Sequence, residues 1–339
     1  MSLNHEGEIS NVSDTALWVA TFRGQEGARR DAAFHDPLAN LLAGTRGPSI
    51  AAAMQRSAVV AWSLIIRTAA IDRLLIDALA TGIDCVLNLG AGLDTRPYRM
   101  PLPSSLRWIE VDFPNIVELK NSQLSGHTAA CRIERVGLDL LDRSSRNALF
   151  ARLGLECNNA LVISEGVLPY LSNDDVARLA GDIISIPSFR NWIMDFDNAG
   201  KRRMPRVWEK RLRAAPFLFQ VAEWFEFFEQ MGWQPATVIT SAEQSAKMGR
   251  PYPFAFPLGL IMHVLPSSVR DKILNLSGAV LLQKQQSEDA HDPLSLGLRP
   301  TSGDLASGPA PAPLRREMKL LATRIDRYKR RQSFQPGQW

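Results

Sequence analysis

Cysteine is scarce in this sequence of 339 residues. Its three cysteines are Cys85, Cys131 and Cys157, and no two of them have CxxC spacing. Such a set supports neither a disulfide framework nor a structural zinc site, so we expect a reducing, cytoplasmic setting. Long, wholly apolar runs are missing too, and the uncharged segment between Arg56 and Arg67, residues 57–66, has about half the length of a membrane-spanning helix. The polar amino-terminal stretch has no apolar core, so we expect neither a membrane span nor a signal peptide.

The sequence also has no large excess of charge of one sign. Its formal net charge is +4, and residues 287–339 carry +3 of it, with nine Lys or Arg against six Asp or Glu. The other 286 residues therefore sum to only +1. This balance gives no electrostatic reason to expect nucleic-acid binding.

The carboxy-terminal part differs in composition from the rest. Residues 287–313 are rich in Pro, Gly, Ser and Ala and contain no aromatic residue, which predicts a flexible linker. Residues 314–339 begin with a basic amphipathic helical pattern. Two interpretations of this tail stay open. It is either a helix that docks on a partner or on an anionic surface, or a solvated extension.

Residues 1–286 alternate between strand-like and helix-like segments, which predicts an α/β fold with a doubly wound, Rossmann-like parallel sheet. Several strand-like runs are wholly apolar, as expected of strands covered on both faces. The predicted strands are residues 85–89, 108–111, 132–136, 160–164, 192–196, 236–240 and 279–282. The predicted helices are residues 71–80, 114–123, 172–184 and 221–231.

A glycine-containing loop follows the first predicted strand, in the sequence NLGAGLD at residues 88–94. Gly90 and Gly92 would allow a tight turn and the close approach of a ligand. A dinucleotide-binding fingerprint would need a third small residue where Thr95 stands, and Pro97 follows soon after. A nicotinamide oxidoreductase is therefore a disfavoured alternative.

Acidic residues follow the next three predicted strands. Asp112 lies 22 residues after Gly90, about where a carboxylate would accept hydrogen bonds from ribose hydroxyls, and Asp139 and Glu165 lie just past the third and fourth strands. Each residue alone could be a helix cap. Together they predict a ligand site, because the carboxyl ends of parallel strands meet at one edge of the sheet.

These segments resemble the leucine carboxyl methyltransferase family, including its bacterial branch of S-adenosylmethionine-dependent O-methyltransferases linked to polyketide and other secondary metabolism. The resemblance covers residues 12 to about 200. It rests on VSDTALWVATFRG at 12–24, FHDPLA at 34–39, RTAAID at 67–72, NLGAGLDTRPYR at 88–99, EVDFP at 110–114, Asp139-Leu140 and SEGVLPYL at 164–171. It implies a seven-stranded class I methyltransferase sheet with an amino-terminal helical cap at about 12–80 and a lid at about 200–232.

The resemblance also implies the cofactor S-adenosylmethionine and the product S-adenosylhomocysteine. The sequence has no HExxH motif and no histidine paired with the strand-end carboxylates, so we expect a metal-free methyl transfer. Arg67 would bind the carboxylate of the methionyl part, Gly90 would lie against the cofactor, and Asp112 would hold the ribose. Asp139 and Leu140 would hold the adenine, and Glu165 would face the methionyl end. Arg23 is either a basic residue that the family places in this segment or a surface charge.

The acceptor end is less defined by the sequence. Tyr170 would either lie nearest the reacting methyl group or serve only in the packing of the protein interior. Arg96 and Arg99 could bind an acidic substrate or brace the glycine loop. Seven aromatic residues in 217–233 predict helical core packing or a lid, and the loop 250–257 is a candidate pocket wall. His263, in an apolar run, is read as structural, so no general base is evident and a carboxylate acceptor is favoured.

The sequence therefore predicts an O-methyltransferase that acts on a carboxylate or hydroxyl of a small apolar or aromatic acid or phenol, in secondary, polyketide-type metabolism. Two alternatives stay open. One is methylation of a protein's C-terminal carboxylate. The other is a non-catalytic nucleotide-binding interaction module.

Overall fold

The computed structural model describes residues 9, 11–53, 57–197, 213–253 and 276–285. Their centre is a seven-stranded sheet in the order β3-β2-β1-β4-β5-β7-β6. β7 is antiparallel to both of its neighbours, and β1 to β5 pair in parallel. Each predicted strand falls within an observed one, and the predicted fold class is confirmed. The strands are β1 Cys85–Leu89, β2 Arg107–Asp112, β3 Arg132–Gly137, β4 Ala160–Ser164, β5 Phe189–Asp197, β6 Trp233–Thr240 and β7 Ser277–Lys284.

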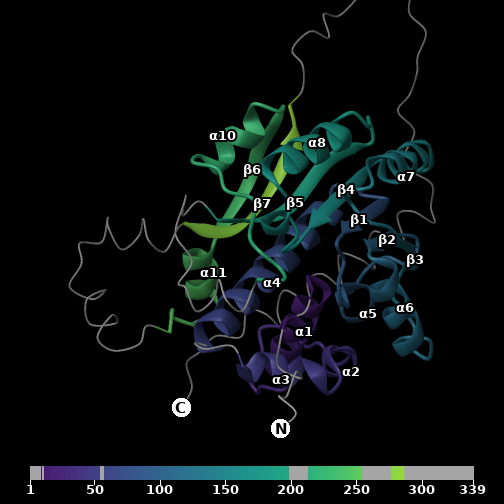
Figure 1. Ribbon diagram of the computed structural model, residues 1–339. Helices are drawn as coiled ribbons and strands as arrows, with labels where there is room; N and C mark the ends of the chain where they lie inside the picture. Colours follow the sequence, from purple (N-terminus) through teal and green to yellow (C-terminus); the bar gives the residue numbers. More distant parts are fainter. Residues whose placement is uncertain (1–8, 10, 54–56, 198–212, 254–275, 286–339) are drawn as a thin grey trace, which may run out of the picture.

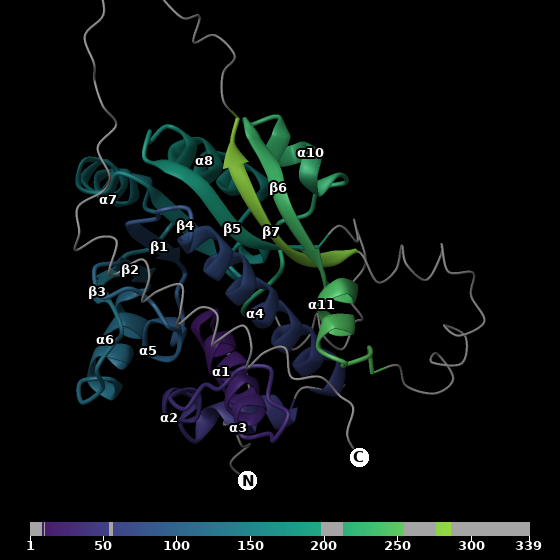
Figure 2. The same cartoon turned by 180° about the vertical axis from the view of Figure 1, so that it is seen from behind.

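Helices cover both faces of this sheet (Figures 1 and 2). Leu87 on β1 faces a core shared with the helices of one side, whereas its neighbour Val86 faces a second core built on α4. This alternation explains why the central strands are apolar throughout. The first face carries α7 Arg143–Glu156, α8 Asn173–Ile184 and α10 Trp224–Glu229, and the second carries α4 Ser57–Leu79.

Local sequence signals set several helix ends. The hydroxyl of Ser172 accepts a hydrogen bond from the backbone N–H of Asp175 at 3.1 Å and starts α8. α6 Pro114–Gln123 has the predicted bounds, whereas α4 begins 14 residues before the predicted start. The remaining short helices are α5 Arg96–Arg99, the 3-10 helix η2 Leu168–Tyr170 and α11 Ser241–Lys247.

Three further helices precede α4, namely α1 Ser13–Gly27, α2 Ala39–Ala43 and α3 Arg46–Ala53. They gather beyond the carboxyl ends of β1 and β4 (Figure 1). Arg46 on α3 makes a two-pronged ion pair with Asp14 on α1, at 2.6 and 2.8 Å, which ties the helices together. The amino-terminal helices thus form a layer over the edge of the sheet where ligands bind in such folds.

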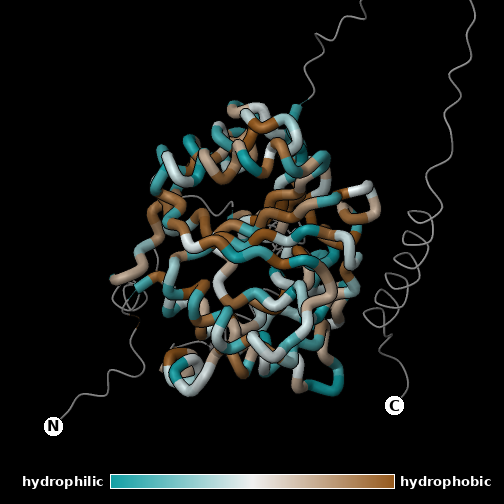
Figure 3. Tube along the Cα trace, turned by 90° about the vertical axis from the view of Figure 1, so that its right-hand side faces the viewer, coloured by the Kyte–Doolittle hydropathy of each residue, from teal (hydrophilic) through white to brown (hydrophobic). Residues whose placement is uncertain are grey.

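Apolar residues are concentrated along the strands, and hydrophilic ones lie more to the outside (Figure 3). Within the described part of the chain, no helix is both long enough and apolar enough to cross a bilayer. The predicted linker and tail at 287–339, the first part of the predicted lid, and His263 lie outside the described residues.

Candidate active site

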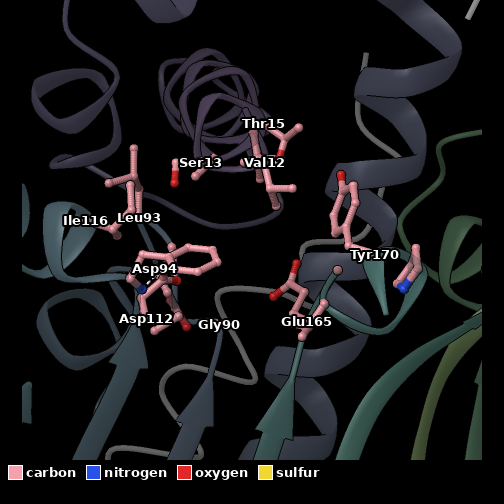
Figure 4. Close-up of a pocket in the computed structure, with 18 of the residues that line it drawn as sticks. Val12, Ser13, Thr15, Gly90, Leu93, Asp94, Asp112, Ile116, Glu165 and Tyr170 are labelled. Atoms are coloured by element: carbon pink, nitrogen blue, oxygen red, sulfur yellow. Dashed lines mark hydrogen bonds between the residues drawn. The ribbon is translucent and has the colours of Figure 1, made fainter. Parts of the chain in front are cut away.

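A cavity of about 650 Å³ lies between the carboxyl ends of the central strands and helix α1. Its floor comes from the ends of β1, β2 and β4, and its roof from the first turns of α1 (Figure 4). All seven residues that the sequence assigns to the site line this one cavity: Arg67, Gly90, Asp112, Asp139, Leu140, Glu165 and Tyr170.

The glycine loop reaches the cavity directly after β1. Gly90 has a φ of +59°, a backbone conformation that glycine adopts without strain. A Cβ at this position would lie 2.4 Å from Cγ2 of Val167, so the loop and the turn after β4 can approach this closely only with glycine here.

Asp112 at the end of β2 is held by two backbone donors. Its Oδ2 accepts from the N–H of Gly92 at 2.6 Å, and its Oδ1 accepts from the N–H of Phe113 at 2.8 Å. Burial raises the pKa of the Asp112 carboxyl, although the two N–H groups oppose that rise. The carboxylate is therefore fixed in the cavity wall, beside the glycine loop, as a hydrogen-bond acceptor.

The segment after β3 forms one end of the cavity. Asp139 is exposed and accepts a hydrogen bond from the N–H of Leu141 at 2.9 Å, which orders the turn. Leu140 lies beside it, and Phe113 and Ile116 line the same cavity. This end combines carboxylates with apolar side chains, a combination suited to a flat, partly polar ring.

Glu165, after β4, is clamped between two arginines. Its Oε2 accepts from Arg96 at 2.7 Å and its Oε1 from Arg67 at 3.1 Å. Burial alone would raise the pKa of Glu165, but Arg96 and Arg67 lower it to about 2. Glu165 is thus a carboxylate at any ordinary pH and a poor proton acceptor.

The side chains of Arg96 and Arg99 are buried outside the cavity lining, and Arg96 braces the glycine loop through Asp94. Arg96 is 1% exposed and pairs with Asp72 at 2.7 Å and Asp94 at 2.8 Å. Arg99 donates to Asp72 at 2.6 and 2.9 Å, and its guanidinium lies over the ring of Phe34. The bracing alternative is therefore confirmed for Arg96, whereas Arg99 joins α5 to Asp72 of α4, and direct binding of an acidic substrate by these two buried side chains is wrong.

Arg23 on α1 is 5% exposed, so the surface-charge interpretation is wrong. Its Nε lies 3.0 Å from Oδ2 of Asp36, its Nη2 donates to the carbonyl of Leu93, and the side chain lines the cavity. This contact joins the amino-terminal helices to the glycine loop.

The opposite end of the cavity is apolar and aromatic. Tyr170 lies beneath α1 near Thr15 (Figure 4), and its ring packs edge-on against Phe217 with the centroids 5.3 Å apart. Burial raises the pKa of Tyr170, although a hydrogen bond with Thr15 opposes this. The rest of this wall is contributed mainly by apolar side chains of α1, its N-cap residue and α4: Val12, Trp18, Val19, Val59, Val60 and Leu64.

The other aromatic residues of segment 217–233 pack away from this wall. Trp224 and Phe228 are buried in the core beneath the sheet, where Phe228 packs on Trp192 with ring centroids 5.6 Å apart. The core-packing interpretation is therefore confirmed for these residues, and Phe217 is the aromatic side chain of this segment that lines the cavity.

Comparison with known proteins agrees with this architecture. The profile of the leucine carboxyl methyltransferase family matches residues 16–184. A protein of Frankia alni, provisionally named an S-adenosyl-L-methionine-dependent methyltransferase, is 32% identical over 265 residues, which are 72% of this chain and 90% of that protein. The chain belongs to the leucine carboxyl methyltransferase family.

Other relatives support the same family. A Streptomyces coelicolor protein of the same provisional name is 37% identical over 183 residues, and the match covers 51% of this chain and 65%, slightly less than two thirds, of that protein. A crystal structure of a DUF574 protein from Streptomyces avermitilis shares the fold, with a TM-score of 0.51 at 15% identity over 80% of this chain and 97% of that one. The leucine carboxyl methyltransferase resemblance is thus confirmed, and with it S-adenosylmethionine as the cofactor of this family member.

The sequence interpretation missed Asp195 on β5. Its Oδ1 accepts from the N–H of Gly166 at 2.7 Å, and its Oδ2 lies 3.3 Å from Nη1 of Arg67. A signal was present, because Asp195 is an acidic residue near the carboxyl end of the otherwise apolar run 192–196. Asp72 and Asp94 were missed as well, since burial among arginines has no local sequence signal.

Proposed function

We propose that this protein is an S-adenosylmethionine-dependent O-methyltransferase whose acceptor is a carboxylate or hydroxyl of a small apolar or aromatic molecule. The observation that carries the proposal is that one cavity joins a polar end, formed by strand termini, to an apolar end, formed by α1 and α4. The two ends meet between Glu165 and Tyr170 (Figure 4).

The polar end fits the cofactor. Asp112 presents a fixed carboxylate to the ribose hydroxyls, and Gly90 allows the ligand to approach the backbone. Asp139 and Leu140 would hold the adenine. Arg67 and Glu165 would hold the methionyl part, with the guanidinium binding its carboxylate.

The cofactor, when bound, supplies a methyl group on a positively charged sulfonium. The task of the protein is then to align the acceptor oxygen and to exclude water. The apolar wall of α1 and α4 serves the second purpose, and the aromatic pair of Tyr170 and Phe217 would position the acceptor. Tyr170 is proposed here as a positioning residue.

The acceptor follows from the same wall. Apolar and aromatic side chains favour an acceptor with an apolar or aromatic body. An acceptor carboxylate is already ionised at neutral pH and needs no general base. The nearby Glu165 is held as an ion-paired carboxylate and is a poor proton acceptor, so a carboxylate is the acceptor group we favour. We further propose, from the bacterial branch of the family, that the acceptor belongs to secondary, polyketide-type metabolism.

Two measurements test this proposal. Calorimetric titration should show micromolar binding of S-adenosylhomocysteine and no binding of NADH. Methyl transfer from radiolabelled S-adenosylmethionine to a panel of apolar carboxylic acids and phenols should then identify the acceptor group, because mild alkali releases the label from an ester and not from an aryl ether. Transfer to a peptide carboxylate and to no small molecule would replace the proposal with the protein-methylation alternative.

A further inference from the structure

Arg67 is held on two sides by carboxylates from different strands. Its Nε donates to Oε1 of Glu165 at 3.1 Å, and its Nη1 donates to Oδ2 of Asp195 at 3.3 Å. Its Nη2 has no hydrogen-bond partner among the described residues. Because a guanidinium is planar and rigid, fixing Nε and Nη1 also fixes the direction of Nη2.

Gly166 fits closely against this guanidinium. It has a φ of +67°, and a Cβ on it would lie 3.2 Å from Nη2 and 3.3 Å from Nη1 of Arg67. The N–H of Gly166 donates to Oδ1 of Asp195 at 2.7 Å. Asp195 therefore uses one oxygen to hold the turn after β4 and the other to hold the arginine above that turn.

We propose that Asp195 is a positioning residue for the carboxylate of the methionyl part of the cofactor. It orients Arg67 so that Nη2 stays available to that carboxylate, and it fixes the turn that carries Glu165. This inference rests on the proposed role of Arg67 in the cofactor site. It assigns a function to a residue of β5 that does not itself line the cavity.

The test compares two ligands that differ in the aminocarboxypropyl group, which carries the carboxylate that Arg67 would bind. S-adenosylhomocysteine contains the amino-acid carboxylate, whereas 5′-methylthioadenosine keeps the adenosine and the sulfur and lacks that carboxylate. Asp195→Asn keeps an oxygen for the N–H of Gly166 and removes the charge facing Arg67. We expect it to weaken S-adenosylhomocysteine roughly tenfold in calorimetry and to change the Kd of 5′-methylthioadenosine less than twofold.

Three further variants complete the experiment. Arg67→Ala should show the same ligand selectivity, and adding Asp195→Asn to it should cost no further affinity, because the two residues act as one unit. Asp174→Asn removes an exposed charge on α8 and should leave both affinities unchanged. If Asp195→Asn does not fold, Asp195→Ser, which also offers an oxygen to Gly166, takes its place.

The outcomes separate this inference from the proposed function. If Asp195→Asn weakened both ligands equally, or neither, Asp195 would have no positioning role, even with Arg67→Ala selective as expected. If Arg67→Ala itself showed no selectivity, the assignment of Arg67 to the cofactor carboxylate would fail, and this inference with it.

Discussion

Asp112 and Gly92, twenty residues apart in the chain, are joined by a hydrogen bond of 2.6 Å from the glycine N–H to the carboxylate. The bond connects the end of β2 to the loop that follows β1. The residue proposed to hold the ribose therefore also shapes the glycine loop, so one side chain determines two parts of the cofactor site.

Replacing Asp112 with alanine should weaken cofactor binding. The variant loses an ionised hydrogen-bond acceptor for the ribose, worth about 1.5–3 kcal/mol, or roughly 10- to 150-fold in Kd. Titration with S-adenosylhomocysteine measures the effect, and Asp174→Ala, at an exposed position of α8, is the control. An unchanged affinity in the Asp112 variant would show that the ribose assignment is wrong.

Replacing Gly90 with alanine should destabilise the protein more than the same change at Gly82. Both glycines have positive φ, +59° and +85°, so each variant incurs left-handed strain of about 1–2 kcal/mol. At Gly82 no atom lies within 4 Å of the new Cβ, whereas at Gly90 it overlaps Val167 and adds about 1–3 kcal/mol.

Urea unfolding of the two variants measures this difference. Combining Gly90→Ala with Val167→Ala should remove the overlap and part of the excess cost, although the cavity left by the valine offsets some of the recovery. Equal losses at Gly82 and Gly90 would mean that the contact with Val167 has no energetic role.

Glu165 should make stability depend on pH in the acid range. Its pKa in the folded protein is about 2, below the ordinary value of 4.5, so the folded state binds fewer protons than the unfolded state. The stabilisation is complete above about pH 4.5 and is lost as the pH falls toward 2, by up to about 3 kcal/mol.

The measurement is the free energy of unfolding at pH 7, 5 and 3.5. Glu165→Gln should show a shallower fall with acid than the parent protein. Glu243→Gln, which removes a pair with Arg73 at the surface, should follow the parent. Parallel curves for parent and Glu165→Gln would contradict the lowered pKa.

Phe217 should affect the acceptor and not the cofactor. Phe217→Ala removes the ring that packs on Tyr170, and an aromatic contact is worth about 0.5–1.5 kcal/mol beyond its buried area. We expect kcat/KM for the best acceptor of the panel to fall roughly 2- to 12-fold, with the Kd of S-adenosylhomocysteine unchanged.

Leu218→Ala is the matched control, since Leu218 is 50% exposed and does not line the cavity. Equal effects of the two changes on the acceptor would place Phe217 outside the acceptor wall.

The sheet could be predicted because its strands are short apolar runs between turn signals, which is a local property. The start of α4 could not be predicted, because residues 57–70 are almost uncharged. Without a polar face, their sequence shows little of the periodicity that marks a helix. The antiparallel direction of β7 depends on pairing with β5 and β6, and it has no sequence signal of its own.

The positions of the site residues could be predicted because topology brings strand ends together. Their ion pairs could not, since Arg67 and Glu165 are 98 residues apart, and Arg96 is paired with Asp72 on a different element. A charged residue that is 0–1% exposed cannot be distinguished in a sequence from one in solvent. For this reason the sequence left Arg96 with two possible roles, substrate binding or bracing of the glycine loop, and gave no role to Asp72.

The roof of the cavity is made by α1, whereas its floor is made by the loops after β1, β2 and β4. In the proposed function, the part of the acceptor wall that α1 contributes is encoded ahead of all the residues assigned to the donor, from Arg67 to Glu165. The donor residues can be preserved while α1 diverges. Exchanging α1 between relatives is therefore a route to new acceptor specificities. Chimeras joined ahead of α4 would keep the residues assigned to the donor and would change the α1 side chains that face the acceptor.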